Sequence, residues 1–147
     1  MTEEAKVRSV ALFYFFAFMD EAVAKLATET TLDACNRKIS KENLPNEKWS
    51  SLIVSETNRG WHKYKDYVGR DINVEVPGET WILADKVSLG QWKEFLKSSD
   101  ENELKSVVWS QILGFLDDDI SSGLGISSGN VRFRVSRGLR HLGRLQH

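Results

Sequence analysis

An unbroken apolar run, Val10–Met19, constrains the fold of this chain more than any other feature of its sequence. Its residues recur at three- and four-residue spacing on more than one face, which predicts a helix that must be covered on most sides. The run is too short to span a bilayer, which needs roughly 20 residues. The charges before it cancel, and acidic Asp20 and Glu21 follow it, unlike the flanks of a signal peptide. We therefore expect a buried helix and no association with a membrane.

Helical periodicity fills most of the remaining sequence and is interrupted in two places. The segment Asn43–Asn46 contains Pro45, which removes a backbone donor and constrains the residue before it, so it predicts a break. Residues 69–81 include two glycines and a proline around an alternating segment, so we expect a linker with some extended backbone. The sequence thus predicts an all-α protein with two small helical lobes, over residues 1–68 and 82–147.

Capping residues and apolar spacing place the individual helices. Asp20 can cap the helix that follows the apolar run, and Ser127 or Ser128 can cap the last helix of the chain. Gly60 weakens the helix that contains it. Beyond the apolar run, the expected helices cover about 20–38, 47–67, a segment after Trp81 with Val87 and Phe95, a segment from Leu104 to Leu116, and two short helices over 117–124 and 128–145.

The distribution of charge separates the C-terminal part from the rest. The net charge of −1 would on its own predict no nucleic-acid partner. However, residues 121–147 carry five arginines and no acid, whereas residues 98–120 carry six acids against Lys105 alone. Such asymmetry is typical of a protein with a polyanion partner. The alternative is a basic helix packed beside the acidic segment within one domain.

The last two predicted helices form a recognisable unit. Asp117 and its acidic neighbours suit a helix N-terminus, and Gly125 suits the turn at its end. In the final helix Val131, Val135 and Leu142 belong to one apolar stripe, with the arginines on its flanks and far side. A short helix, a glycine turn and an arginine-faced helix make up the helix-turn-helix unit that places its second helix in the major groove.

These residues resemble region 4 of sigma-70-type transcription initiation factors, in particular the small extracytoplasmic-function group. Departures from the pattern are Ser121, Gly123, Asn130 and Phe133, and Gly123 is expected to loosen the first helix. Three roles stay open for Phe133, namely contact with a thymine methyl, part of a protein interface, or a half-covered surface position. The matching residues are Ile120, Leu124, Gly125, Ile126, Ser127, Gly129, Val131, Arg132, Arg134, Val135, Arg137, Leu139 and Leu142.

The N-terminal half is similar to region 2 of the same family over two short segments. Glu29–Ala34 is similar to the end of the motif that contributes to polymerase binding, although Lys25 and Thr28 depart from it. The resemblance implies polymerase contacts by Leu26, Glu29, Thr30 and Leu32. Leu52–Asn58 is similar to a second segment of region 2.

After that segment, aromatic and basic residues alternate where promoter-melting residues of the family would lie. Aromatic rings stack on unpaired bases, and cations hold the strand. The alternative is that the rings belong to the core and the lysines are solvated. The implied single-strand contacts are Trp61, Lys63, Tyr64 and Lys65.

The resemblance implies a sigma factor that directs transcription initiation. Its partners would be double-stranded DNA, core RNA polymerase and an anti-sigma or other regulatory protein. The alternatives are a sigma-like adaptor that has lost promoter function, or a helix-turn-helix regulator that acts without polymerase. The implied duplex contacts are Ser127, Ser128, Asn130, Arg132, Phe133, Arg134, Arg137 and Arg140.

The sequence holds no pattern that predicts an enzyme. Its three histidines have no partner at metal-ligand spacing, and consecutive acids at 117–119 fit a helix start better than a cation site. It contains no phosphate-binding loop and no nucleophile elbow. The lone Cys35 excludes an intrachain disulfide and fits a reducing, cytoplasmic location. We expect a protein without catalytic residues, metal or cofactor.

Overall fold

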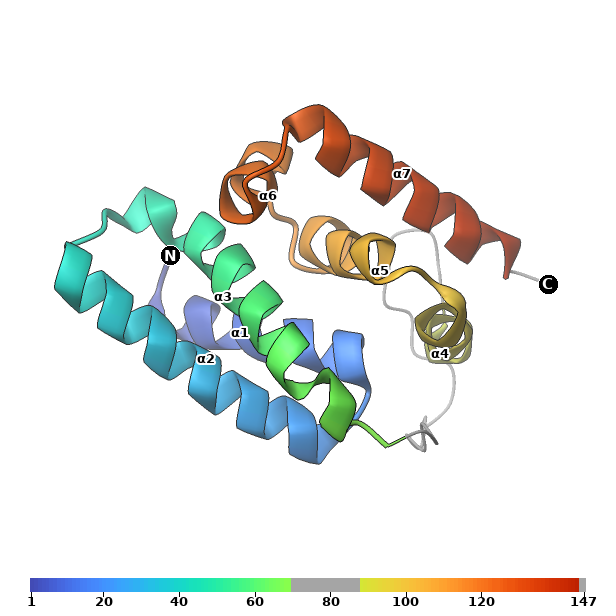
Figure 1. The fold of residues 1–147 in the computed structure, drawn as a ribbon, viewed down its shortest axis with the longest axis horizontal. Coiled ribbons are helices and arrows are strands. Elements are labelled where there is room, and N and C mark those ends of the chain that lie inside the picture. The colour runs from blue at the N-terminus through green and yellow to red at the C-terminus, as the bar shows by residue number, and fades with distance from the viewer. Residues whose placement is uncertain (70–87, 146–147) are drawn as a thin grey trace.

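The computed structural model describes residues 1–69 and 88–145, and the elements in these two ranges are helices (Figure 1). The prediction of an all-α fold is confirmed. The helices form two groups, which we call the N-terminal lobe (α1–α3) and the C-terminal lobe (α4–α7). The predicted linker, apart from Gly69, lies outside the described residues, as does its expected extended stretch.

The apolar run lies in α1 (Glu3–Phe18), the buried helix of the N-terminal lobe. Phe13, Tyr14 and Phe18 are among its buried residues, which confirms that it is covered on more than one side. Met19, with φ of 52°, ends the helix in the left-handed region. Asp20 then caps the next helix by accepting a hydrogen bond from the backbone N–H of Val23, as predicted.

Two further helices complete the N-terminal lobe and pack on α1 and on each other. They are α2 (Glu21–Glu42) and α3 (Trp49–Tyr64), and α3 is flanked by the single 3₁₀ turns Asn46–Lys48 and Lys65–Tyr67. The predicted break therefore falls between α2 and α3. Gly60 lies inside α3, where a Cβ would collide with the Tyr14 hydroxyl oxygen. Glycine fits this position because α1 and α3 approach each other closely here.

The C-terminal lobe consists of α4 (Leu89–Ser98), α5 (Glu101–Val107), α6 (Asp117–Leu124) and α7 (Ser128–Arg144). The predicted helix that includes Val87 begins at Leu89, and Val87 lies outside the described residues. The helix expected to reach Leu116 ends earlier, because α5 continues only as a π turn over Val108–Ile112. Gly114 follows with φ of 70°, and Leu116 is exposed.

The two lobes share one hydrophobic core. Helix α6 packs on α3, and the π turn after α5 packs on α1. At the centre of this contact the Trp109 ring stacks on Phe13, with centroids 5.3 Å apart. We call this packing the closed arrangement. None of the described helices is both long enough and apolar enough to cross a membrane.

Candidate nucleic-acid interface

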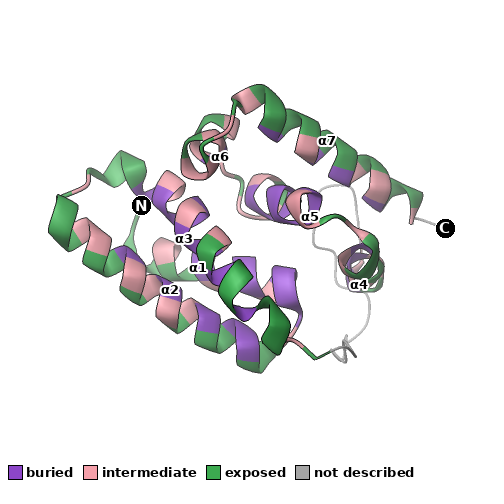
Figure 2. Ribbon diagram, in the orientation of Figure 1, coloured by how far each residue is buried: buried purple, intermediate pink, exposed green. Residues whose placement is uncertain are grey.

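The helix-turn-helix unit consists of α6, the turn at Gly125 and α7. Gly125, with φ of 71°, ends α6, and Ser127 caps α7 by accepting a hydrogen bond from the Asn130 N–H. The predicted stripe on α7 faces α5 with Val131, Val135 and Leu142 buried. Figure 2 shows that the exposed residues of α7 lie on the side away from α5. The stripe thus presents the opposite side of the helix to solvent.

The solvent-facing side of α7 carries most of the predicted duplex contacts. Arg132, Arg137 and Arg140 are exposed. The cap residue Ser127 and Asn130 of the first turn are also exposed, whereas Ser128 is half-buried. Phe133 is 56% exposed, and the Arg137 guanidinium lies 5.6 Å from its ring centroid. The face therefore combines cations with one exposed aromatic ring.

Two arginines of this face also contact acidic residues of the same lobe. Arg137 Nε lies 3.0 Å from Glu103 Oε1, and Arg132 Nη1 lies 3.9 Å from Asp117 Oδ2. Glu103 is almost fully buried, so its carboxylate is held beside α7 by α5. The alternative of a basic helix beside the acidic segment is thus realised for these two residues.

The acidic residues at 117–119 occupy the first turn of α6, as expected from the helix dipole. The cap position is Leu116, and no side chain caps the helix there. Asp118 Oδ1 accepts a 2.7 Å hydrogen bond from Ser128 Oγ, which ties the start of α6 to the start of α7. No group of three or more potential metal ligands occurs within 1–69 and 88–145.

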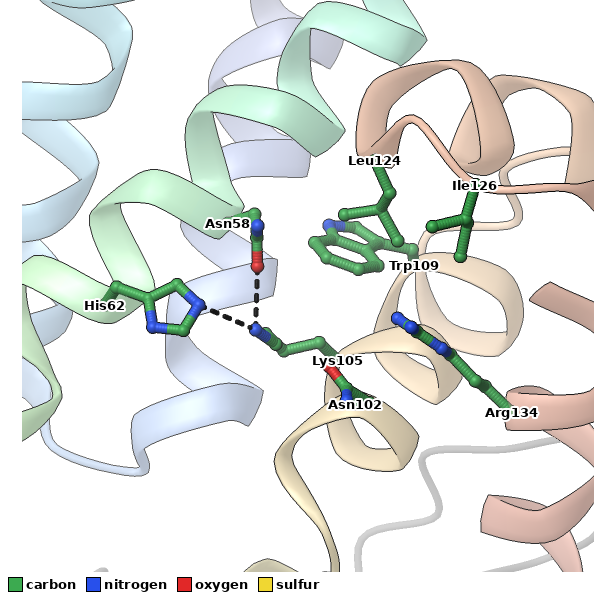
Figure 3. A pocket seen from close by; sticks show the side chains of 8 residues that line it. All are labelled: Asn58, His62, Asn102, Lys105, Trp109, Leu124, Ile126 and Arg134. Carbon is green, nitrogen blue, oxygen red and sulfur yellow. Dashed lines mark hydrogen bonds between the residues drawn. The ribbon is translucent and has the colours of Figure 1, made fainter. Parts of the chain in front are cut away.

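Arg134 differs from the other arginines because it is half-buried and lines a pocket between the lobes (Figure 3). The pocket has a volume of about 160 Å³. It also holds Asn58 and His62 from α3, and Asn102 and Lys105 from α5. Sequence reasoning missed this cluster. The one feature of the sequence that could have indicated it is Lys105, a basic residue among the buried apolar positions of an otherwise acidic segment.

The proposed single-strand residues divide into two kinds. Trp61 and Tyr64 are buried, with Trp61 9% exposed, whereas Lys63 and Lys65 are exposed. Two ammonium groups lie near the Trp61 ring, with Lys105 Nζ 4.5 Å and Lys65 Nζ 5.2 Å from its centroid. The single-strand role stays a prediction, and both rings would have to lose their cover before bases could stack on them.

The residues expected to bind polymerase lie on α2. Leu26 is 49% exposed and Glu29 is exposed, so both face solvent. Thr30 is partly buried, and its hydroxyl shares a 2.9 Å hydrogen bond with the Tyr64 hydroxyl. Leu32 packs against the core. Only Leu26 and Glu29 are therefore placed for direct contact with a partner, and the role of all four stays a prediction.

The comparisons with known proteins can now be added to this geometry. No protein-family model matches the sequence, and no curated protein matches it. The fold is similar to that of the sigma factor RpoE, solved in a co-crystal with the anti-sigma factor NepR from Bartonella quintana. The match has a TM-score of 0.68 at 18% identity and covers 95% of this chain and 91% of that chain. The chain thus has a sigma-factor fold over both lobes.

Proposed function

We propose that this protein is a sigma factor of the extracytoplasmic-function kind, which directs transcription initiation by binding promoter DNA and core RNA polymerase. The observation that carries the proposal is the exposed basic face of α7, the second helix of a helix-turn-helix unit within a sigma-factor fold. The proposal assigns the protein a binding role rather than an enzymatic one.

The exposed side of α7 is suited to duplex DNA. Arg137 and Arg140 would reach guanine edges or phosphates with their forked guanidinium groups, and Asn130 can pair with adenine. Phe133 would supply an apolar contact for a thymine methyl. Ser127 and Ser128 would bind a phosphate at the helix start.

Duplex binding is tested with Arg140→Ala and a matched control. The probe is a pool of random 30-base-pair duplexes, selected on the wild-type protein and then measured by fluorescence anisotropy. Arg140→Ala should weaken binding about 5- to 150-fold, whereas Arg8→Ala, which removes an exposed arginine from α1, should leave the affinity nearly unchanged. Equal affinities for the wild type and Arg140→Ala would remove α7 from the proposal.

Polymerase binding is tested on α2 by size-exclusion co-elution with bacterial core RNA polymerase. Leu26 is an exposed apolar residue, and Leu26→Asp places a charge where the family contact would form. Val7 on α1 is similarly exposed, so Val7→Asp is the matched control. We expect the wild type and Val7→Asp to co-elute with polymerase and Leu26→Asp to elute alone. Failure of the folded wild type to co-elute would contradict the polymerase role.

The closed arrangement favours a second function, that of a sigma-like adaptor regulated by or acting on another protein. Two arginines of α7 lie beside Glu103 and Asp117, and further acids lie at the start of α6, where they would repel phosphates. The RpoE neighbour was crystallised with an anti-sigma factor, which supports a regulatory protein as partner here. Salt dependence separates the two functions, because a duplex binder loses affinity steeply as salt rises.

A further inference from the structure

The pocket between the lobes collects polar side chains from three helices. Asn58 and His62 come from α3, Lys105 from α5 and Arg134 from α7 (Figure 3). In the figure the Lys105 ammonium points toward Asn58 and His62, and the Arg134 guanidinium enters the pocket from the side of α7. The pocket therefore exists only while α7 and α3 are held together in the closed arrangement.

Lys105 is buried without a carboxylate partner. Lys105 is only 3% exposed. Its Nζ donates hydrogen bonds to two neutral acceptors, Asn58 Oδ1 at 2.7 Å and His62 Nε2 at 3.3 Å. A buried ammonium group is normally paired with an anion, because neutral acceptors do not compensate for lost hydration.

Arg134 lines the same pocket and is half-buried. Among the described residues, neither Arg134 nor Lys105 forms an ion pair. The acids close enough to affect Lys105 are Glu101 and Asp100, and Asp100 accepts a hydrogen bond from the Asn102 backbone as the cap of α5. Burial is the main cause that lowers the pKa of Lys105, and the charge of Arg134 lowers it further.

We propose that this pocket binds one oxyanion of the size of phosphate between Lys105 and Arg134. An ammonium and a guanidinium group that line one pocket from two helices suit a tetrahedral anion with several acceptor oxygens. The amide groups of Asn58 and Asn102 add neutral donors. A volume of about 160 Å³ is below the range of pockets for organic ligands, roughly 300–1,000 Å³, but holds a single phosphoryl group.

The bound oxyanion would connect α5 and α7 to the α3 side of the pocket. Because the pocket requires the closed arrangement, the anion binds that arrangement in preference to an open one and stabilises it by mass action. The site is thus a means by which a phosphoryl group keeps the two lobes together. It does not depend on the proposed contacts with promoter DNA or polymerase.

The test measures thermal unfolding of the full chain in inorganic phosphate against sodium chloride of equal ionic strength. Phosphate at about ten times its Kd should raise the unfolding midpoint of the wild type by roughly 3–6 °C. Phosphate also stabilises folded proteins by exclusion from their surface, so the readout is the difference between variants. Arg134→Gln should lose the specific rise, and Arg144→Gln, on an exposed arginine of the same helix, should keep it.

A direct titration separates specific binding of phosphate from its general stabilising effect. Calorimetry with inorganic phosphate should give one site in the wild type and in Arg144→Gln, and at least a tenfold weaker site in Arg134→Gln. Lys105→Met, which keeps the length of the buried side chain, should show the same loss, with circular dichroism to confirm that it is folded. No heat in the wild type, or equal binding by Arg134→Gln, would overturn the proposal.

The source of the phosphoryl group is resolved by comparing ligands. Equal binding of phosphate and O-phosphoserine would mean that the phosphoryl group alone is recognised, and tighter binding of phosphoserine would indicate a phosphorylated partner. Equal binding of acetate would contradict the tetrahedral anion. None of these measurements uses DNA or polymerase, so the oxyanion site can fail while the proposed function stands, and the reverse.

Discussion

Trp109 Nε1 donates a 3.0 Å hydrogen bond to Thr57 Oγ1, and this bond joins the two lobes at a point from which solvent is excluded. Thr57 in turn donates to the carbonyl oxygen of Ile53 within α3. The Trp109 ring stacks on Phe13 of α1. One side chain of the C-terminal lobe is thus packed against two helices of the N-terminal lobe.

Thr57→Val should lower the free energy of unfolding by about 1–3 kcal/mol, because it leaves the buried Trp109 N–H without an acceptor. Trp109→Phe removes the donor as well as part of the ring. If the bond matters, the double variant should be more stable than the sum of the two single losses predicts. The measurement is urea unfolding of all four proteins, and strict additivity would show that the bond contributes nothing.

Gly123→Ala should separate α6 from α3. A Cβ at this position would lie 2.6 Å from the Ser51 carbonyl oxygen and 2.7 Å from Val54 Cβ, neither of which can move without shifting α3. We expect a loss of about 1–3 kcal/mol in the free energy of unfolding, as in other overpacked sites. Gly143→Ala is the control, because nothing lies within 4 Å of its Cβ and alanine favours the helix. A neutral Gly123→Ala would contradict the closed arrangement.

The helix-turn-helix unit could be predicted from the sequence because local rules define it. Gly125 permits a left-handed residue, Ser127 caps the helix that follows, and the apolar stripe of α7 repeats on the helical period. These features depend on neighbours within a few residues. The bounds of α6 and α7 therefore agree with the predicted 117–124 and 128–145 to within one residue.

The contact between the lobes could not be predicted, because residues far apart in sequence create it. Gly123 departs from the family pattern and was expected to loosen α6, but it allows α6 to approach Ser51 of α3. The end of α5 was missed for a related reason. The Phe115 N–H donates to the Trp109 carbonyl oxygen in place of a regular helical bond, and the ring of Trp109 stacks on Phe13 of α1.

The pocket between the lobes could not be predicted from the sequence either. The charge count identified Lys105 as the one cation of an acidic segment, but no local rule places its ammonium beside Asn58 and His62. Spacing on the helix groups Arg134 with the arginines predicted to contact DNA, because it does not tell which flank of α7 another lobe covers. Both assignments require the tertiary structure.

His62 should titrate below its ordinary value in the folded protein. Desolvation and the neighbouring Lys105 ammonium both lower its pKa, as does Lys65, while Glu101 raises it. Nuclear magnetic resonance of the imidazole should therefore give a pKa below about 6.5 for the wild type. Lys105→Met should raise that pKa because it removes the like charge, and Lys93→Met should leave it unchanged. The same or a lower pKa in Lys105→Met would contradict the pairing.

The lowered pKa also sets the sign of a pH effect on stability. Below about pH 6.5 the unfolded chain binds more protons at His62 than the folded chain does, so the free energy of unfolding falls as the pH drops through that value. Protonation also removes the Nε2 acceptor of the Lys105 ammonium. His62→Gln should flatten this part of the stability profile relative to the wild type, as measured by urea unfolding at a series of pH values; an unchanged profile would contradict the assignment.

Glu103→Gln should strengthen duplex binding if α7 is the DNA-binding helix. The Glu103 carboxylate is held 3.0 Å from Arg137 Nε by α5, so part of the charge of Arg137 is neutralised before any phosphate arrives. Removing the carboxylate frees that charge, and the slope of log Kobs against log salt should become more negative by about 0.9, equivalent to one further phosphate contact. The control is Glu94→Gln on α4, which removes an exposed acid that forms no ion pair among the described residues. An equal change of the salt slope in both variants would mean that only the net charge of the protein matters. A change confined to Glu103→Gln would mean that the Glu103 carboxylate weakens the contact of Arg137 with DNA.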